Sequence, residues 1–140
     1  MTIRVLVAGL GNMGRSHALA YATNPDFEVV GLVNRSKLDL PSELAGHLIT
    51  PDFHEALARL QPDLVCIATY SDTHADYAVA AMEAGADVFV EKPLATNVAD
   101  AERVAEAARR TGRKVVVGYI LRHHPSWIRL IEESRALGGP

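Results

Sequence analysis

Short apolar runs recur along this chain, and each is followed by a stretch in which apolar residues return at helical spacing. The runs cover residues 3–8, 28–33, 64–68, 88–90 and 115–117. They lack the strict alternation of apolar and polar residues that marks a strand with one wet face. Continuous apolar runs of this kind are typical of strands buried on both faces, as in parallel sheets. The pattern therefore predicts five strands at these positions.

The segments that follow the runs predict helices. They cover residues 14–23, 53–60, 73–84 and 98–111, with a last helix from 125 to the glycines at 138 and 139. The clearest is 98–111, where Asn97 can cap the first turn and Gly112 can end the helix. We expect one face of this helix to be buried, formed by Val98, Ala101, Ala105 and Ala108.

Strands and helices therefore alternate along the chain. Because crossovers between parallel strands are right-handed, this order predicts an α/β fold built on a doubly wound parallel sheet. Residues 35–51 have no strong period, and we expect a loop with some helix there. The length of 140 residues suits a single domain.

Composition and charge narrow the function classes. Hydrophobic residues make up 49% and charged residues 22% of the chain, as in ordinary globular proteins. The net charge of −3 disfavours sequence-independent binding of nucleic acid, which needs clustered cations. Cys66 is the only cysteine, so we expect no disulfide within the chain and no cysteine-based metal site. The N-terminus lacks a signal-peptide pattern and no apolar run is long enough to span a membrane, so we expect a cytoplasmic protein.

The first predicted strand leads directly into Gly9-Leu10-Gly11-Asn12-Met13-Gly14, a G-x-G-x-x-G motif between a strand and a helix. In that context Gly9 permits a tight turn, Gly11 leaves room for a pyrophosphate, and Gly14 lets the helix pack close to the strand. The free N–H groups at the helix start then face the phosphates. The motif predicts a dinucleotide site. The alternatives are a glycine turn without a ligand and a methyltransferase that binds S-adenosylmethionine.

The end of the second predicted strand bears on the choice of cofactor. A domain that binds NAD usually carries an acid about 20 residues after the motif, which holds the ribose 2′-hydroxyl. Asn34 occupies that position and is followed by Arg35, Ser36 and Lys37, which can donate hydrogen bonds. An acid would repel a 2′-phosphate by about 4 kcal/mol at about 4 Å and an effective dielectric of about 20, whereas Asn34 does not. Because Arg35 also offers a planar fork to a phosphate, we predict a preference for NADP(H), with NAD(H) as the other cofactor. The alternative is that Arg35 and Lys37 are solvated loop cations.

Glu91-Lys92-Pro93-Leu94 follows the fourth predicted strand. Ligands of open α/β sheets bind outside the carboxyl ends of the strands, so we expect Lys92 at the crevice. Its ammonium can donate to a reacting oxygen and stabilise the charge that develops during hydride transfer. The neighbouring Glu91 would favour the charged form of Lys92. On spacing alone, a surface ion pair is an equal alternative.

Other residues carry weaker signals. We expect His17 to be a packing or surface residue, and Cys66 to be buried and unreactive in the middle of a strand. Trp127, Ile128 and Ile131 are either ordinary core residues or an exposed apolar surface that can drive association.

The motifs together resemble one family. The glycine motif, Ala68-Thr69-Tyr70-Ser71-Asp72-Thr73-His74, Ala84-Gly85 and Glu91-Lys92-Pro93-Leu94 stand in the order and spacing seen in the N-terminal domain of the glucose-fructose oxidoreductase / inositol dehydrogenase / rhizopine catabolism (Gfo/Idh/MocA) family. Glu-Lys-Pro argues against a methyltransferase. The resemblance implies a Rossmann-type dinucleotide-binding domain over residues 1–122. Residues 123–140 would then form a helix and the start of a crossover to the family's C-terminal α/β substrate domain, which this chain lacks.

The resemblance also implies roles for individual residues. The pyrophosphate loop would consist of Gly9, Gly11, Asn12, Met13 and Gly14. The adenosine end would be contacted by Asn34 and Arg35, with Ser36 as a further donor. The path to the nicotinamide would be lined by Ala68, Thr69, Tyr70, Thr73 and His74. Beside the nicotinamide would lie Glu91 and Lys92, with Lys92 as the catalytic residue, and Arg122 would lie near cofactor and substrate.

These expectations combine into one function. The chain would be the NAD(P)-binding domain of an oxidoreductase that transfers a hydride between nicotinamide and a secondary alcohol or ketone of a sugar, polyol or related compound. In the family the C-terminal domain completes the active site, so the activity of the 140-residue chain alone stays open. The alternative is a stand-alone module that binds or senses NADP(H) without turnover. The expected partners are a small-molecule substrate and a second copy of the chain in a homo-oligomer, with no nucleic acid, membrane or metal.

Overall fold

A computed structural model describes residues 2–36 and 38–139 of the chain. Within them, six strands follow one another: β1 (Ile3–Ala8), β2 (Phe27–Val33), β3 (Ile49–Thr50), β4 (Leu64–Ile67), β5 (Asp87–Val90) and β6 (Val115–Val117). The α-helices of the same residues are α1 (Asn12–Thr23), α2 (Phe53–Leu60), α3 (His74–Glu83), α4 (Val98–Thr111) and α5 (Pro125–Ala136). Short 3₁₀ turns cover Ser42–Leu44 (η1), Ser71–Thr73 (η2) and Ile120–His123 (η3).

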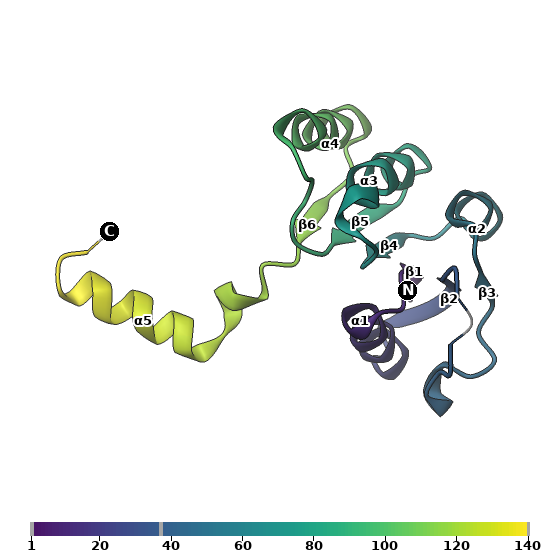
Figure 1. Ribbon diagram of the computed structural model, residues 1–140, viewed down its shortest axis with the longest axis horizontal. Coiled ribbons are helices and arrows are strands. Elements are labelled where there is room, and N and C mark those ends of the chain that lie inside the picture. The colour runs from purple at the N-terminus through teal and green to yellow at the C-terminus, as the bar shows by residue number, and fades with distance from the viewer. Residues whose placement is uncertain (1, 37, 140) are drawn as a thin grey trace.

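The strands form one parallel sheet in the order β3-β2-β1-β4-β5-β6. Helix α1 and the turn η1 cover one face, and α2, α3 and α4 cover the other (Figure 1). This arrangement confirms the predicted doubly wound fold. The strand order reverses between β1 and β4, and sheets of this kind bind ligands outside the carboxyl ends of the strands at that point.

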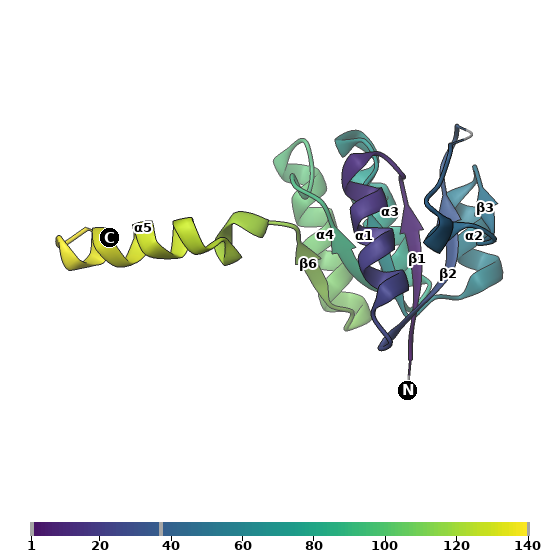
Figure 2. The ribbon, with the colours of Figure 1, turned by 90° about the horizontal axis from the view of Figure 1, so that it is seen from below.

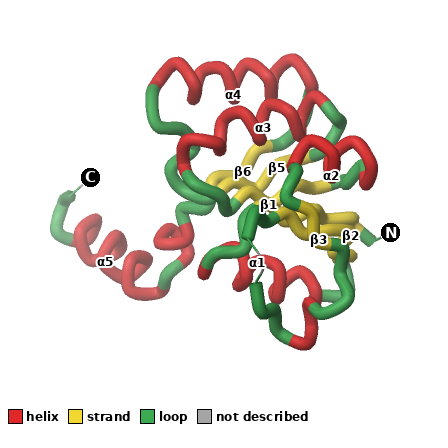
Figure 3. The backbone as a smooth tube through the Cα atoms, turned by 45° about the vertical axis from the view of Figure 1, so that its right-hand side comes forward, coloured by secondary structure: helices red, strands yellow, loops and turns green. Residues whose placement is uncertain are grey.

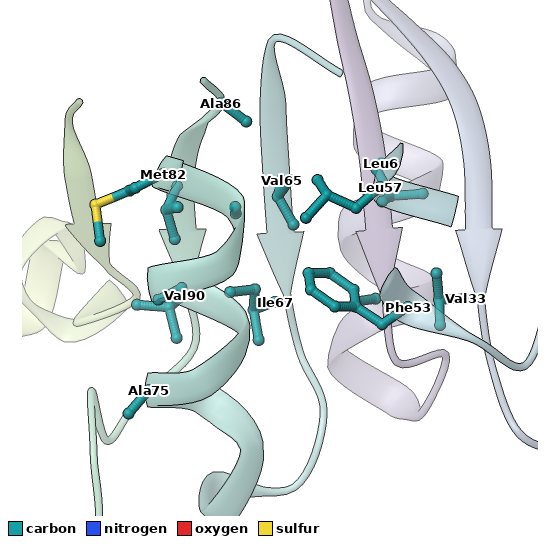
Figure 4. Packing of buried hydrophobic residues seen from close by; sticks show 14 of the residues in the cluster. Leu6, Val33, Phe53, Leu57, Val65, Ile67, Ala75, Met82, Ala86 and Val90 are labelled. Atoms are coloured by element: carbon teal, nitrogen blue, oxygen red, sulfur yellow. The ribbon is translucent and has the colours of Figure 1, made fainter. Parts of the chain in front are cut away.

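The core consists of two layers, one on each side of the sheet. Val5, Leu6, Val7 and Ala8 of β1 are all fully buried. Because side chains alternate along a strand, Leu6 and Ala8 join the cluster under α2 and α3, and Val5 and Val7 join the cluster under α1. Figure 4 shows the first cluster, in which Phe53 and helix α3 pack over the central strands. Because both faces of the central strands are buried, the ends of these strands are held in place, and so are the loops that follow them.

Helix ends follow the local signals. The Oδ1 atom of Asn97 accepts a hydrogen bond from the Asp100 N–H at 2.9 Å, which confirms the predicted cap of α4. Gly112 follows α4 with a φ of 69°, in the left-handed region that favours glycine. Asp52 caps α2 in the same way, through a 3.0 Å hydrogen bond from the Glu55 N–H.

The segment 35–51 differs from the expectation, because it contains the additional strand β3 as well as the turn η1. Hydrogen bonds from the Leu32 N–H to the Leu48 carbonyl (2.9 Å) and from the Asn34 N–H to the Thr50 carbonyl (3.0 Å) join β3 to β2. The strand is two residues long, so its own sequence has too few positions to show a period.

The buried face of α4 also differs. Val104 and Ala107 are buried, whereas Val98 is 73% exposed and Ala105 is exposed as well. The prediction of a face containing Val98 and Ala105 was wrong. Alanine occurs on several sides of this helix, and packing against α3 selects the side that is covered.

Helix α5 projects away from the sheet (Figures 2 and 3) and buries none of its residues. Trp127, Ile128 and Ile131 are 45%, 43% and 40% exposed. Of the two alternatives for these residues, an exposed apolar surface is the one found. In the described part of the chain, no helix combines the length and apolar character needed to cross a membrane.

Candidate functional site

The glycine loop after β1 is closed to side chains at two of its three glycines. Gly9 has a φ of 87°, and a Cβ there would lie 2.5 Å from the carbonyl oxygen of Ala68. A Cβ on Gly14 would lie 1.8 Å from the carbonyl oxygen of Gly9. At Gly11, by contrast, φ is −66° and a Cβ would meet no atom within 4 Å. Among the glycines of the described residues, Gly11 alone combines an ordinary φ with open space, so the fold itself does not require glycine there.

Helix α1 begins at this loop without a cap from the protein. Gly11 is the N-cap residue and has no side chain to accept a hydrogen bond, and the first turn contains no acidic residue. Helices α2 and α4, in contrast, each have a side-chain cap and an acid in the first turn. The positive end of the α1 dipole is therefore open to an anion. The side chains of Asn12 and Met13 are exposed there.

Backbone hydrogen bonds bring the carboxyl ends of the strands side by side. The residue after a strand donates its N–H to the last residue of a neighbouring strand, at 2.8 Å in four pairs: Gly9 to Val33, Ala68 to Ala8, Glu91 to Ile67 and Gly118 to Val90. The glycine loop, residues 68–70 and the Glu91-Lys92 turn therefore adjoin one another along one edge of the sheet. We call this edge the crevice.

The side chain of Asn34 at the end of β2 is used within the protein. Its Oδ1 atom accepts a hydrogen bond from the Leu10 N–H at 3.1 Å, and its Nδ2 donates to the carbonyl of Ser36 at 2.7 Å. Asn34 thereby links the glycine loop to the turn after β2. It also lines a pocket of about 670 Å³, together with Leu10, Arg35, Ser36, Leu38, Asp39, Ile49 and Pro51. Lys37, expected as a further donor, lies outside the described residues.

Arg35 lines two pockets. Besides the pocket at the end of β2, it lines a smaller one of about 220 Å³ with Gly11, Ala68, Thr69 and Tyr70. Residues predicted for the pyrophosphate and for the nicotinamide path therefore share a hollow with the predicted phosphate-binding arginine. The Arg35 side chain is exposed, so its charge is accessible to a ligand.

The carboxylate of Glu91 is buried and is engaged by the protein. Its Oε1 atom accepts a hydrogen bond from His17 Nε2 at 2.8 Å, and its Oε2 atom accepts one from the Lys92 backbone N–H at 3.2 Å. The Lys92 side chain is exposed and forms no ion pair within the part of the chain that the structure describes. The expected influence of Glu91 on the charge of Lys92 therefore does not act through a direct ion pair.

The turn after β4 is held by side-chain hydrogen bonds. The hydroxyls of Thr69 and Thr73 lie 2.7 Å apart, and Thr73 donates to the Tyr70 carbonyl at 2.8 Å. His74 is only 1% exposed, and its ring nitrogens face the carbonyl oxygens of Pro93 (2.7 Å) and Thr69 (3.2 Å). A direct contact between His74 and a cofactor, as the resemblance implies, is not available to a ring enclosed in this way. Tyr70 is 75% exposed.

Lys92 and Arg122 come together in a third pocket, of about 580 Å³. Its other walls come from the segment after β6 and from α5: Gly118, Tyr119, Ile120, Leu121, Trp127 and Ile131. Most of these walls are apolar. Among the described residues that line the pocket, only Lys92 and Arg122 are charged. His124 caps α5 by accepting a hydrogen bond from the Ser126 N–H at 3.3 Å.

Two parts of the site were missed by the sequence reasoning. His17 was expected to be a packing or surface residue, although it stands one helical turn after Gly14 and therefore shares its sheet-facing side. That spacing is the signal that could have found it. Leu38, Asp39, Ile49 and Pro51 of the pocket at β2 lie in the segment without a period and carry no such signal.

Cys66 takes no part in the crevice. It is fully buried in β4, and burial raises the pKa of its thiol to about 12, so the reactive thiolate is rare at neutral pH. The predicted burial of Cys66 is confirmed. Across residues 2–36 and 38–139, no group of three histidine, cysteine or acidic side chains could hold a metal ion.

The parallel sheet, the glycine loop and the crevice along the strand ends define a dinucleotide-binding domain of the Rossmann type. The model of the Gfo/Idh/MocA oxidoreductase family, described as having an NAD-binding Rossmann fold, matches residues 3–119, and the chain belongs to this family. The match confirms the resemblance carried by the motifs. Membership in an oxidoreductase family also removes the methyltransferase alternative.

Similar proteins are named as dehydrogenases. 4-Carboxy-2-hydroxymuconate-6-semialdehyde dehydrogenase of Sphingobium sp. is 37% identical over 129 residues, which cover 89% of this chain and 40% of that protein. Inositol 2-dehydrogenase of Salmonella paratyphi B is 32% identical over 148 residues, which cover 100% of this chain and 44% of that protein. The structure of scyllo-inositol dehydrogenase from Lactobacillus casei with bound NAD(H) and scyllo-inositol shares the fold, with a TM-score of 0.82 at 23% identity over 96% of this chain and 42% of that one. The chain thus spans less than half the length of these proteins.

Proposed function

We propose that this chain is the NAD(P)-binding part of an oxidoreductase that transfers a hydride between nicotinamide C4 and a secondary alcohol or ketone of a sugar, polyol or related compound. The observation that carries the proposal is the row of strand ends along the crevice. A dinucleotide that crosses the switch point of such a sheet has its adenosine on the β2 side and its nicotinamide on the β4 and β5 side. The row thus supports a single ligand reaching from Arg35 to Lys92. The dehydrogenase names of the relatives support the reaction class.

The chain's own residues would bind and orient the reactants. Backbone N–H groups at the start of α1 would hold the pyrophosphate, for which Gly11 leaves space. A bound nicotinamide supplies or accepts the hydride. Lys92 would donate a hydrogen bond to the reacting oxygen and stabilise negative charge on it. Arg122, which lines the same pocket, would offer a second donor to the substrate.

We further propose a preference for NADP(H). Arg35 lines both the pocket at β2 and the hollow that contains Gly11, which suits a phosphate on the ribose between them. Asn34 adds no negative charge at the position where an acid would repel that phosphate. Asp39 lines the same pocket with the opposite charge to Arg35. The two side chains therefore make opposing contributions to the preference.

Calorimetric titration with NADPH, NADH and S-adenosylmethionine tests both proposals. We expect NADPH to bind more tightly than NADH, and S-adenosylmethionine not to bind. Arg35→Ala should weaken NADPH binding by about 10- to 100-fold, the equivalent of one charge-assisted hydrogen bond, and leave NADH nearly unchanged. Asp39→Asn is the matched control. It removes the negative charge from the same pocket and should strengthen NADPH binding. Tighter binding of NADH refutes the preference, and binding of neither nicotinamide refutes the cofactor site.

Turnover is tested in the protein as its native reading frame encodes it. Lys92→Met keeps a long side chain without the ammonium and should lower kcat by about 10²- to 10⁴-fold, the range of general acid catalysis. Affinity for NADPH should fall by no more than about tenfold, because only the nicotinamide end of the cofactor loses a contact. Polyols are the first substrates to test, because relatives are named inositol 2-dehydrogenases. Tight cofactor binding without turnover would favour the stand-alone binding module. Homo-oligomer formation and the cytoplasmic location stay predictions.

A further inference from the structure

Two histidines contact the Glu91-Lys92-Pro93 turn from different helices. His17 of α1 donates from Nε2 to Glu91 Oε1 at 2.8 Å, and its ring meets the Phe89 ring edge-on with the ring centroids 4.9 Å apart. Phe89 and Glu91 are two positions apart, so they point to the face of the sheet that α1 covers. The contact with His17 therefore holds the turn on its α1 side.

His74 holds the same turn on its α3 side. A neutral imidazole has one N–H, and the shorter of its two contacts is the 2.7 Å one from Nδ1 to the Pro93 carbonyl. Nδ1–H therefore donates to Pro93, and Nε2 lies 3.2 Å from the Thr69 carbonyl. Because Thr69 lines the hollow with Gly11 and Arg35, His74 stands between that hollow and the turn.

We propose that His17 and His74 are positioning residues that hold the turn from both sides and so fix Lys92 in the crevice. The proposal rests on the function proposed above, in which Lys92 acts beside the nicotinamide. Lys92 itself is exposed and forms no ion pair among the described residues, so its placement depends on the backbone of its two neighbours. Both neighbours are held by a histidine: Glu91 through its carboxylate and Pro93 through its carbonyl.

His17 also connects the turn to the other end of the site. It follows Gly14 by one helical turn on α1, and the N-terminus of α1 forms the glycine loop. A Cβ on Gly14 would lie 3.3 Å from the Cβ of Ala68, so this side of α1 lies against the strand ends. A single rigid helix therefore carries both the proposed phosphate site and the contact to Glu91. Movement of α1 away from the sheet would loosen both.

The burial of Glu91 explains why the contact needs a hydrogen-bond donor. A carboxylate taken out of water without a partner is strongly destabilising, and His17 supplies the side-chain partner of Oε1. An apolar residue at position 17 would leave that oxygen unpaired, and the carboxylate would turn toward water. The Lys92 backbone N–H donates a hydrogen bond to Oε2 of the same carboxylate, so Lys92 would move with the carboxylate. Gln at position 17 would restore a donor close to the place of Nε2.

Imidazole ¹⁵N NMR of the chain without ligand tests the contacts directly. We expect a protonated Nε2 on His17 and a protonated Nδ1 on His74, with the His74 signal assigned by its loss in His74→Asn. An unprotonated Nε2 on His17 or an unprotonated Nδ1 on His74 would overturn the proposal. This measurement is independent of cofactor binding, so it decides the contacts even where the proposed function fails.

Binding of NADPH and of 2′-phospho-ADP-ribose, which is NADPH without the nicotinamide, tests positioning against a general structural role. His17→Leu should weaken NADPH binding about tenfold and change the emission of the bound nicotinamide, while the fragment keeps its Kd. His17→Gln should restore both readouts. Equal weakening of both ligands, or no change in either, contradicts the positioning role. Failure of the wild type to bind both ligands counts against the cofactor site instead.

Discussion

Replacing Gly11 with alanine separates cofactor binding from folding. A Cβ at this position would meet no protein atom within 4 Å, and the φ of −66° suits any residue. Alanine has fewer conformations than glycine in the unfolded chain. This raises the free energy of unfolding by about 0.4–1 kcal/mol, but alanine is less favourable than glycine at the N-cap of α1 by a similar amount, so we expect a net change of less than about 1 kcal/mol.

The same methyl group should impair binding of a dinucleotide. A pyrophosphate that approaches the backbone of the loop would meet the new Cβ and move away from the N–H groups at the start of α1. Each charge-assisted hydrogen bond lost in this way is worth about 1.5–3 kcal/mol. Loss of one such bond raises the Kd for NADPH by about 10- to 100-fold.

Thermal unfolding and calorimetric titration of the same Gly11→Ala sample check the two expectations together. Gly14→Ala is the matched control, because its Cβ would lie 1.8 Å from the Gly9 carbonyl oxygen and should destabilise the loop itself. A Gly11→Ala variant with normal stability and an unchanged Kd would refute the pyrophosphate cradle. A Gly11→Ala variant as unstable as Gly14→Ala would refute the described loop geometry.

Two further predictions concern stability. Asn97→Ala removes the cap of α4 and should lower the free energy of unfolding by about 1 kcal/mol in urea, whereas Asn97→Ser should retain most of it. Burial raises the pKa of the Cys66 thiol to about 12, so the folded protein keeps a proton that the unfolded chain releases above about pH 8.5. This contribution is fully present below that pH and is lost as the pH rises toward 12. Urea unfolding between neutral and alkaline pH should therefore show a steeper loss for the wild type than for Cys66→Ala, and equal slopes would contradict the assignment.

The sequence could predict the fold where structure depends on local pattern. The part of β1 from Val5 to Ala8 is apolar without interruption because both faces of the strand are buried there, and Asn97 and Gly112 bracket α4 through local cap geometry. Strand β3 depends on pairing with β2, and the buried face of α4 depends on its contact with α3. Both are set by residues distant in sequence. No local period could have predicted either.

The candidate site likewise contains some features that depend on local sequence and others that depend on distant residues. The glycine motif and Lys92 stand at strand ends, and strand ends can be found from the sequence. The engagement of Glu91 by His17 joins residues 74 positions apart. The enclosure of His74 likewise depends on the Pro93 carbonyl, a backbone group that no residue pattern describes. Motifs can therefore indicate candidate residues, while tertiary contacts decide whether a residue faces the crevice or holds another residue.

Helix α5 provides a test of how far the folded core extends, because Trp127 is the only tryptophan and its fluorescence reports on this helix and the pocket that it lines. The helix has 12 residues and buries none of them, and isolated helices of that length are marginal in water. Its support is local: the His124 cap, Pro125 in the first turn and the Arg129–Glu133 ion pair. We therefore expect the fluorescence of Trp127 to change at lower urea than the far-ultraviolet ellipticity of the core. Coincident transitions at every protein concentration would show that α5 unfolds with the sheet. Coincidence only at high concentration would mean that the exposed face formed by Trp127, Ile128 and Ile131 is covered by a second copy of the chain.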